Sequence, residues 1–403
     1  AAVSGASSAG EGEHKILAAL LRNARGSRGG GAAAAGSQGP PRVHVVIGGD
    51  VDLLLQPLAP RGLLEGSQVL IAAPPRGLAG PPMRVCDVGR LGAGICERWR
   101  RALDLSQRAA LEEAPPPGGL ADALELGVRR DFVLVALMRG NDYLPPLSSS
   151  QDPARLWAAY LRWRRGREQG AGGLVGVEVD EQAGRLALCL GPVADFMASC
   201  SGCPPPAPLG GPLGGGDEEA EGVAAYLSGL LWCMETYVHG RTPDFHFRFP
   251  SSLSSHASAR LIAQHAGGYG GPSWSAAEPL APLACAVAML PASEVRALLL
   301  PAAPCLGPLL EPGGLLGEVA RLEGCAECAA LAAAATAAPG AGKKAEKRRR
   351  ALEVHRRGHS DIENVCLAEL GAEVRRRCEA SPQAAELAPL LALGSEVHAG
   401  APG

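Results

Sequence analysis

The sequence lacks the features that mark membrane proteins, disulfide-stabilised proteins and strongly basic proteins. No run of about 18 apolar residues is free of glycine, proline and charge, so no membrane-spanning helix is predicted. The 12 cysteines show no regular spacing of a disulfide framework, which fits a reducing compartment. The formal net charge is only -3, so any binding of nucleic acid must come from local basic patches.

What the chain does contain is enough apolar material for a folded core. Its 403 residues allow two or three domains, and 47% of them are hydrophobic. The 54 glycines and 34 prolines are numerous, and many gather in tracts that predict loops, at 26–41, 115–119 and 204–216.

One stretch, at 42–53, has the strongest pattern. An apolar, β-branched run predicts a buried strand, and two glycines then lead to Asp50 and Asp52 at the start of a helix. In an open α/β sheet, ligands bind beyond the carboxyl ends of the strands. Carboxylates this close repel each other unless a cation neutralises them, which favours a metal site. The alternative is a turn in which the aspartates cap the next helix.

Two further stretches present acids at turns. At 10–21 a glycine-containing turn enters an amphipathic helix, with Glu11 and Glu13 at its mouth and Lys15 placed to meet a phosphate. Ordinary electrostatics of a helix N-terminus explain the same two acids. At 129–146 an apolar helix ends at Gly140, which suits a left-handed C-cap, and Asp142 follows on a tight turn.

The three stretches together resemble a known family. GEGEHKI at 10–16, GGDVDL at 48–53 and GNDYLPP at 140–146 are similar, in this order, to motifs of the XRN-type 5′→3′ exoribonucleases, which belong with the flap-endonuclease/PIN-like nucleases. Val51 stands where that family usually has alanine. The segments 226–250 and 279–291 resemble the family's second shared region and the helix after it, so the resemblance covers roughly 3–310.

The resemblance implies a fold and a division of the chain. We expect an α/β, PIN/flap-nuclease-like core with a parallel sheet and flanking helices, then a mostly helical second region and a helical tail. The expected parts are the C-terminal part of the nuclease domain at 1–165, a variable linker at 166–222, the second, helical region at 223–310, and an alanine-rich, basic helical tail at 311–403. Further expected elements are a strand at 69–73 and a helix at 95–105.

The resemblance also implies a chemistry. It indicates a 5′→3′ exoribonuclease that hydrolyses 5′-monophosphorylated RNA with two ions of Mg²⁺ or Mn²⁺, which prefer hard oxygen ligands. The residues that match the family's metal-binding and catalytic acids are Glu11, Glu13, Asp50, Asp52 and Asp142. For RNA binding we expect Lys15, Trp232, Phe245 and Phe247, the aromatic rings by stacking on bases, although core packing explains the aromatic segment equally well.

The departures from the family matter as much. The family's domain begins well before GEGEHKI, with a first strand, further acids and a basic pocket for the 5′-phosphate. We therefore expect this chain to need such a segment, in cis or as a partner. Without the segment, the sheet is expected to expose an edge or an apolar side, and the chain alone is expected to be weakly active. The rival functions are a flap-type endonuclease, which the segment around Trp232 disfavours, and a non-catalytic relative that binds RNA or protein.

The remaining signals leave alternatives open. A basic run at 343–350 is typical of a solvated helix face, but also of an RNA contact or a nuclear-import signal, so the compartment is nucleus or cytoplasm. Two CxxC pairs, at 200–203 and 325–328, and the pair His355 and His359 can in principle bind zinc, but their spacing favours incidental cysteines.

Overall fold

The fold divides into two compact units. The computed structural model describes residues 2–3, 12–26, 42–75, 83–103, 120–147, 153–165, 173–177, 185–201, 217–250, 253–254, 257–323, 325–336, 347, 351, 365–393 and 397–398. One unit is Gly10–Trp274, and the other is Ser275–Gly403 together with Ala1–Ala9. This division falls inside the expected second region at 223–310.

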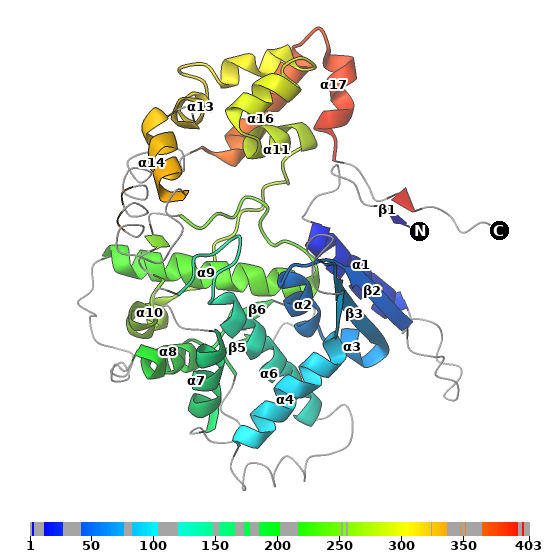
Figure 1. Cartoon of the computed structure of the whole chain (residues 1–403), viewed down its shortest axis with the longest axis vertical. Coiled ribbons are helices and arrows are strands. Elements are labelled where there is room, and N and C mark those ends of the chain that lie inside the picture. The colour runs from blue at the N-terminus through cyan, green and yellow to red at the C-terminus, as the bar shows by residue number, and fades with distance from the viewer. Residues whose placement is uncertain are drawn as a thin grey trace, which may run out of the picture. The chain divides into compact units, whose positions relative to one another are not determined.

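The larger unit is mixed α/β, with a small sheet and many helices (Figure 1). Its strands are β2 (Arg42–Ile47), β3 (Ser67–Ala73), β4 (Arg84–Asp87), β5 (Val175–Val177) and β6 (Leu186–Leu188). Its helices are α1 (Gly12–Gly26), α2 (Asp52–Leu55), η1 (Gln56–Leu58), α3 (Leu63–Gly66), α4 (Val88–Ala102), α6 (Leu120–Leu137), α7 (Pro153–Arg165), α8 (Leu190–Ser201), α9 (Asp217–His239), α10 (Ala259–His265) and η3 (Ala266–Gly268).

The sheet has the order β2-β3-β4 and is only partly parallel. β2 and β3 pair in parallel, with Val45 opposite Leu70, as expected. β4 pairs with β3 in the antiparallel direction, so the expectation of a parallel sheet needs correction. The reason is the short connection at 74–83, because a parallel return needs a crossover of about a dozen residues or more.

The strand β2 is not buried, in contrast to the expectation from its apolar run. Within the described sheet it lies at the edge, and Val43, Val45 and Ile47, which share one face, are 55%, 61% and 72% exposed. Only Val46 on the opposite face is fully buried. Burial depends on neighbouring elements, which a strand's own sequence does not specify; an exposed apolar side of the sheet was also among the expectations above.

The helix α9 forms the centre of this unit's core. It packs against α1, α6, α10 and β6, and Tyr226, Leu230, Cys233 and Tyr237 on it are completely buried. The expected strand at 69–73 is present in β3, and the helix expected at 95–105 begins earlier, at Val88, where the side chain of Asp87 accepts a hydrogen bond from the backbone N–H of Arg90.

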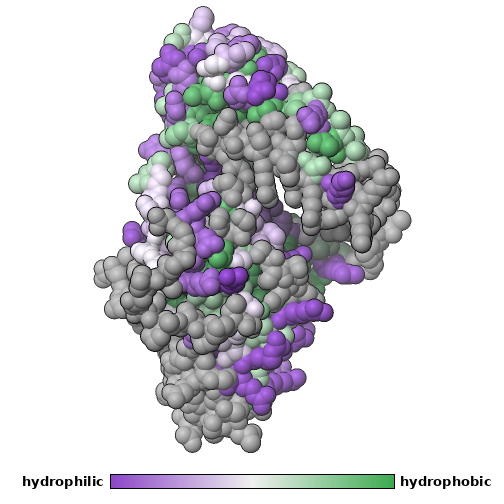
Figure 2. Space-filling view, turned by 90° about the vertical axis from the view of Figure 1, so that its left-hand side faces the viewer, coloured by the Kyte–Doolittle hydropathy of each residue, from purple (hydrophilic) through white to green (hydrophobic). Residues whose placement is uncertain are grey.

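The smaller unit is helical and has its own core. It contains α11 (Pro282–Met289), α12 (Ala292–Glu294), η4 (Val295–Leu299), η5 (Pro304–Leu309), α13 (Gly317–Glu323), α14 (Ala326–Thr336), α16 (Leu367–Glu379) and α17 (Ala384–Leu391), and the short strands β1 (Ala2–Val3) and β7 (Val397–His398) pair with each other. On the face drawn in Figure 2, hydrophilic residues are spread over the described surface and interrupted by small hydrophobic patches.

Several expectations for the tail can now be placed. The alanine-rich helix is α14. Of the basic run at 343–350 the structure describes Lys347 alone, which is exposed. Further on, Arg376 and Arg377 both bind the carboxylate of Glu373, at 2.6 and 2.7 Å, so local pairing already neutralises part of their charge.

The sequence also raised the question of a zinc site and predicted no membrane-spanning helix. The zinc alternative involves Cys203, His355 and His359, which lie outside the described residues, and the cysteines whose side chains are described are free thiols. Among the described helices none combines the length and the apolar character needed to span a membrane.

Candidate functional site

The first part of the site is the turn between β2 and α2. Oδ1 of Asp50 accepts a hydrogen bond of 3.0 Å from the backbone N–H of Asp52, so the first aspartate closes the turn and the second begins the helix. A Cβ added at Gly48 would lie 2.2 Å from Cδ1 of Leu53, which explains the glycine there. Asp50 is exposed and Asp52 is half-buried.

The second part is the turn after α6. Gly140 has φ +91°, so the expected left-handed C-cap is confirmed. Oδ1 of Asn141 accepts hydrogen bonds from the backbone N–H groups of Tyr143 and Leu144, at 3.0 and 2.9 Å. These bonds fix the turn, and Asp142 at its tip is exposed, with its side chain outside the core.

The third part is the start of α1. His14 is buried, and its ring lies 6.1 Å from that of Tyr143, 6.3 Å from that of Trp232 and 6.5 Å from that of Tyr237, measured between centroids. Glu13, one residue before His14, is half-buried. The GEGEHKI and GNDYLPP motifs therefore meet, and they meet on α9.

All three motifs converge on the same stretch of α9. Nδ2 of Asn141 lies 3.6 Å from Sγ of Cys233, which gives a weak hydrogen bond. Burial, followed by the charge of Asp52, raises the pKa of Tyr237. Burial also raises the pKa of Cys233 to about 12, and the charge of Asp52 adds to that shift. Asp52 of the GGDVDL motif is thus close enough to both side chains to act on their ionisation.

The hydroxyl of Tyr237 has an unusual environment. It is completely buried. Burial and the charge of Asp52 raise the pKa of this hydroxyl, hydrogen bonding with Asp52 raises it further, and hydrogen bonding with Asn141 lowers it. The hydroxyl therefore lies close to one residue of the GGDVDL motif and one residue of the GNDYLPP motif.

The five predicted acids have different outcomes. Glu11 lies outside the described residues. Among the acids, histidines and cysteines that are described, no three lie close enough together to hold a metal ion. Carboxylate oxygens are the right type of donor for Mg²⁺ or Mn²⁺. Of these acids, Asp52 lies close to the buried hydroxyl of Tyr237. Convergence of all five acids stays a prediction.

The residues predicted to bind RNA lie at different depths. Trp232 is 4% exposed, stacks on Phe247 at 5.2 Å and donates a hydrogen bond from Nε1 to the backbone oxygen of Asp244. Phe247 is half-buried, and Phe245 is the most exposed of these rings, at 39%. Lys15 is half-buried on α1. The tryptophan therefore has a packing role, and a base has access mainly to Phe245.

The resemblance implies that the helix and aromatic segment at 226–250 pack around the active site, but the sequence assigns no individual role to the residues that join the motifs. His14 and Asn141 stand inside the motifs, next to the predicted acids Glu13 and Asp142. Tyr237 and Cys233, four residues apart on α9, share one helix face, a spacing that is a usable signal.

Comparison with known proteins adds no assignment: no protein-family model matches the sequence, and no curated protein matches it either.

Proposed function

We propose that the protein is a metal-dependent phosphodiesterase of the 5′→3′ exoribonuclease type, with a PIN-like core. The observation that supports this best is the meeting of the three motifs on α9, through His14, Asn141 and the influence of Asp52 on Tyr237. Consecutive motifs are about 30 and about 90 residues apart in the chain, so their convergence is not a result of local structure.

The proposal assigns roles to the residues of the chain. Glu11, Glu13, Asp50, Asp52 and Asp142 would hold two ions of Mg²⁺ or Mn²⁺, which when bound polarise the scissile phosphate and activate a water molecule. Asn141 holds the turn that carries Asp142, and Asp50 holds the turn that carries Asp52. Burial of His14, Cys233 and Tyr237 keeps the floor of the site dry. The substrate is RNA with a 5′-monophosphate.

The test has two readouts, metal binding and hydrolysis. Mn²⁺ is titrated calorimetrically into the full chain and into Asp52→Asn, and a 5′-phosphorylated RNA is then incubated with Mn²⁺ or with excess EDTA. We expect Mn²⁺ binding that Asp52→Asn weakens at least about tenfold, or ~1.4 kcal/mol, and slow RNA hydrolysis that EDTA abolishes. Hydrolysis that persists in EDTA contradicts the proposal, as does failure to bind Mn²⁺.

The matched control is Glu97→Gln. Glu97 is an exposed acid on α4 that pairs with Arg101, one turn further along the same helix. Such exposed pairs contribute little stability. This variant should bind Mn²⁺ and hydrolyse RNA as the unmodified chain does.

A second candidate function is a non-catalytic protein that binds RNA or another protein. It is favoured by the absence, among the described residues, of any group of three potential metal ligands. This function predicts a different result in the same experiment: the protein binds the RNA, and the length of the RNA does not change with Mg²⁺ or with Mn²⁺.

A further inference from the structure

A small pocket of about 170 Å³ contains two arginines, and none of the five predicted acids lines it. Its polar lining comes from Arg61, before α3, from Arg130 on α6 and from His239 at the end of α9. Leu21 and Val238 supply apolar walls. All of these residues belong to the larger unit.

Arg130 is the notable member. It is only 8% exposed, and its Nε donates a hydrogen bond of 3.1 Å to the backbone oxygen of Ala59. That is the only hydrogen bond that the structure gives this guanidinium among the described residues, and no described carboxylate lies within ion-pair distance of it. Burying a charge without a counter-ion is costly, so the arrangement calls for an anion.

The neighbouring charges increase this need. Burial, and then Arg61 and Arg129, lower the pKa of Arg130 to about 10, while Glu235 opposes the shift. Glu235 is already engaged, because its Oε1 accepts a hydrogen bond from the backbone N–H of Leu186 and its Oε2 lies 3.1 Å from Nε2 of His239.

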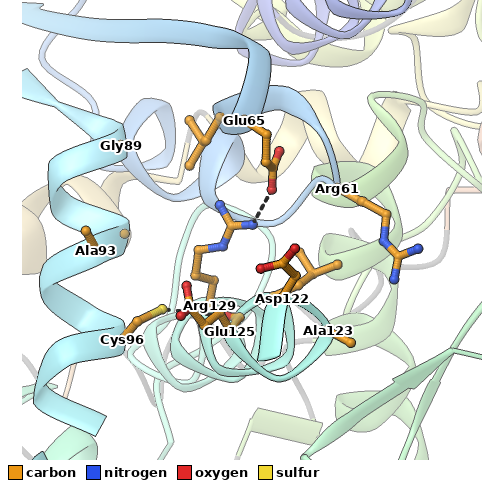
Figure 3. Close-up of a pocket in the computed structure, with 12 residues that line it drawn as sticks. Arg61, Glu65, Gly89, Ala93, Cys96, Asp122, Ala123, Glu125 and Arg129 are labelled. Carbon is orange, nitrogen blue, oxygen red and sulfur yellow. Dashed lines mark hydrogen bonds and ion pairs between the residues drawn. The ribbon is translucent and has the colours of Figure 1, made fainter. Parts of the chain in front are cut away.

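The other two arginines differ in their pairing. Nη2 of Arg129 binds Oε1 of Glu65 at 3.1 Å, on the side of α6 that faces α4. Figure 3 shows the side chain of Arg61 leading away from that pair. The structure gives Arg61 no hydrogen bond and no ion pair among the described residues, so its charge remains available to the small pocket.

We propose that this pocket binds a small tetrahedral oxyanion, a phosphate group, between Arg61 and Arg130. Guanidinium groups bind phosphate oxygens by paired, charge-assisted hydrogen bonds. At about 170 Å³, the pocket has room for one phosphate group. The inference does not depend on nuclease activity.

The experiment measures thermal stabilisation and binding heat for the full chain with inorganic phosphate, against sodium chloride at equal ionic strength. A ligand that binds only the folded state raises the melting temperature with its concentration. We expect such a rise with phosphate. Arg61 is exposed, and Arg61→Gln should weaken phosphate binding about tenfold, or ~1.4 kcal/mol. Arg130→Met should abolish the rise in melting temperature with phosphate.

Arg90→Gln is the control, since the Arg90 side chain on α4 is 90% exposed. It should respond to phosphate as the unmodified chain does. A parallel titration with adenosine 5′-monophosphate distinguishes two sources of the phosphate group. If the nucleotide competes with inorganic phosphate, the pocket accepts the phosphate of a nucleotide; if it does not compete, the pocket binds the free anion. Equal stabilisation by phosphate and chloride, or an unchanged response in Arg61→Gln, overturns the proposal.

Discussion

The hydroxyl of Tyr160 on α7 donates a 2.5 Å hydrogen bond to Oδ2 of Asp131 on α6, in a part of the core that excludes water. Oδ1 of the same carboxylate accepts hydrogen bonds from the backbone N–H groups of Leu174 and Val175, at 2.8 and 3.1 Å. One buried aspartate thus ties α7 and the start of β5 to the helix that leads into the Gly140 turn.

This carboxylate makes stability depend on pH. Burial raises the pKa of Asp131 from 3.8 to about 6, although the hydrogen bonds oppose the shift. Because the folded-state pKa lies above the unfolded one, the contribution to stability is complete below about pH 4 and is lost as the pH rises through about 6. The loss amounts to roughly 3 kcal/mol in the free energy of unfolding.

Urea unfolding of the unmodified chain and of Asp131→Asn, at pH 4.5 and pH 7, checks this prediction. The amide keeps an oxygen for the two backbone N–H groups but does not ionise. Relative to the unmodified chain, the variant should gain about 2 kcal/mol between pH 4.5 and pH 7. A difference in stability that is the same at both pH values contradicts the prediction.

Gly140→Ala should destabilise the protein by about 2 kcal/mol or more. The left-handed φ of +91° costs about 1–2 kcal/mol for an alanine, and the added Cβ would lie 2.7 Å from the backbone nitrogen of Pro146. Gly127→Ala on α6 is the matched control, because no atom lies within 4 Å of its added Cβ. It should gain about 0.5–1 kcal/mol. Thermal unfolding of both variants tests the pair, and equal effects would show that the turn is not constrained.

Tyr237→Phe and Tyr226→Phe should differ in metal binding. Both hydroxyls are buried on α9. That of Tyr226 has no hydrogen-bond partner among the described residues, so Tyr226→Phe should leave stability unchanged or raise it by about 1 kcal/mol. Tyr237→Phe should lower stability by about 1 kcal/mol, because Asp52 and Asn141 interact with its hydroxyl. Only Tyr237 lies near Asp52. Tyr237→Phe should therefore weaken Mn²⁺ binding about tenfold, as loss of a residue that orients a ligand does, and Tyr226→Phe should not. Calorimetric titration measures both; equal Mn²⁺ affinities exclude this role for Tyr237.

The thiol of Cys233 should be unreactive in the folded protein. It is completely buried, and burial raises its pKa to about 12, whereas alkylation needs an accessible thiolate. Cys366 is exposed and serves as the internal reference. After a short treatment with iodoacetamide at pH 8, peptide mass spectrometry should find Cys366 modified and Cys233 intact until denaturant is added. Equal labelling of the two without denaturant contradicts the burial of Cys233.

Local structure was predictable from the sequence where a residue's own backbone or the next few residues decide it. The strand at 42–47, the strand at 69–73 and the helix α14 follow from side-chain periodicity and composition. The left-handed end of α6 follows from Gly140, since only glycine adopts that conformation without strain. The turn that places Asp50 and Asp52 side by side is local in the same sense.

Burial, strand direction and the pairing of charges were decided by the tertiary structure. The apolar strand β2 lies at an edge of the described sheet, and its face with Val43, Val45 and Ile47 is exposed, since the side chains of a strand are buried only where another layer packs on that face. Arg129 and Arg130 are neighbours in the chain, yet one meets Glu65 and the other meets no carboxylate among the described residues, because adjacent positions on a helix differ in direction by about 100°. The three motifs were predictable one by one; that α9 brings them together depends on contacts between residues distant in the sequence, which no local pattern encodes.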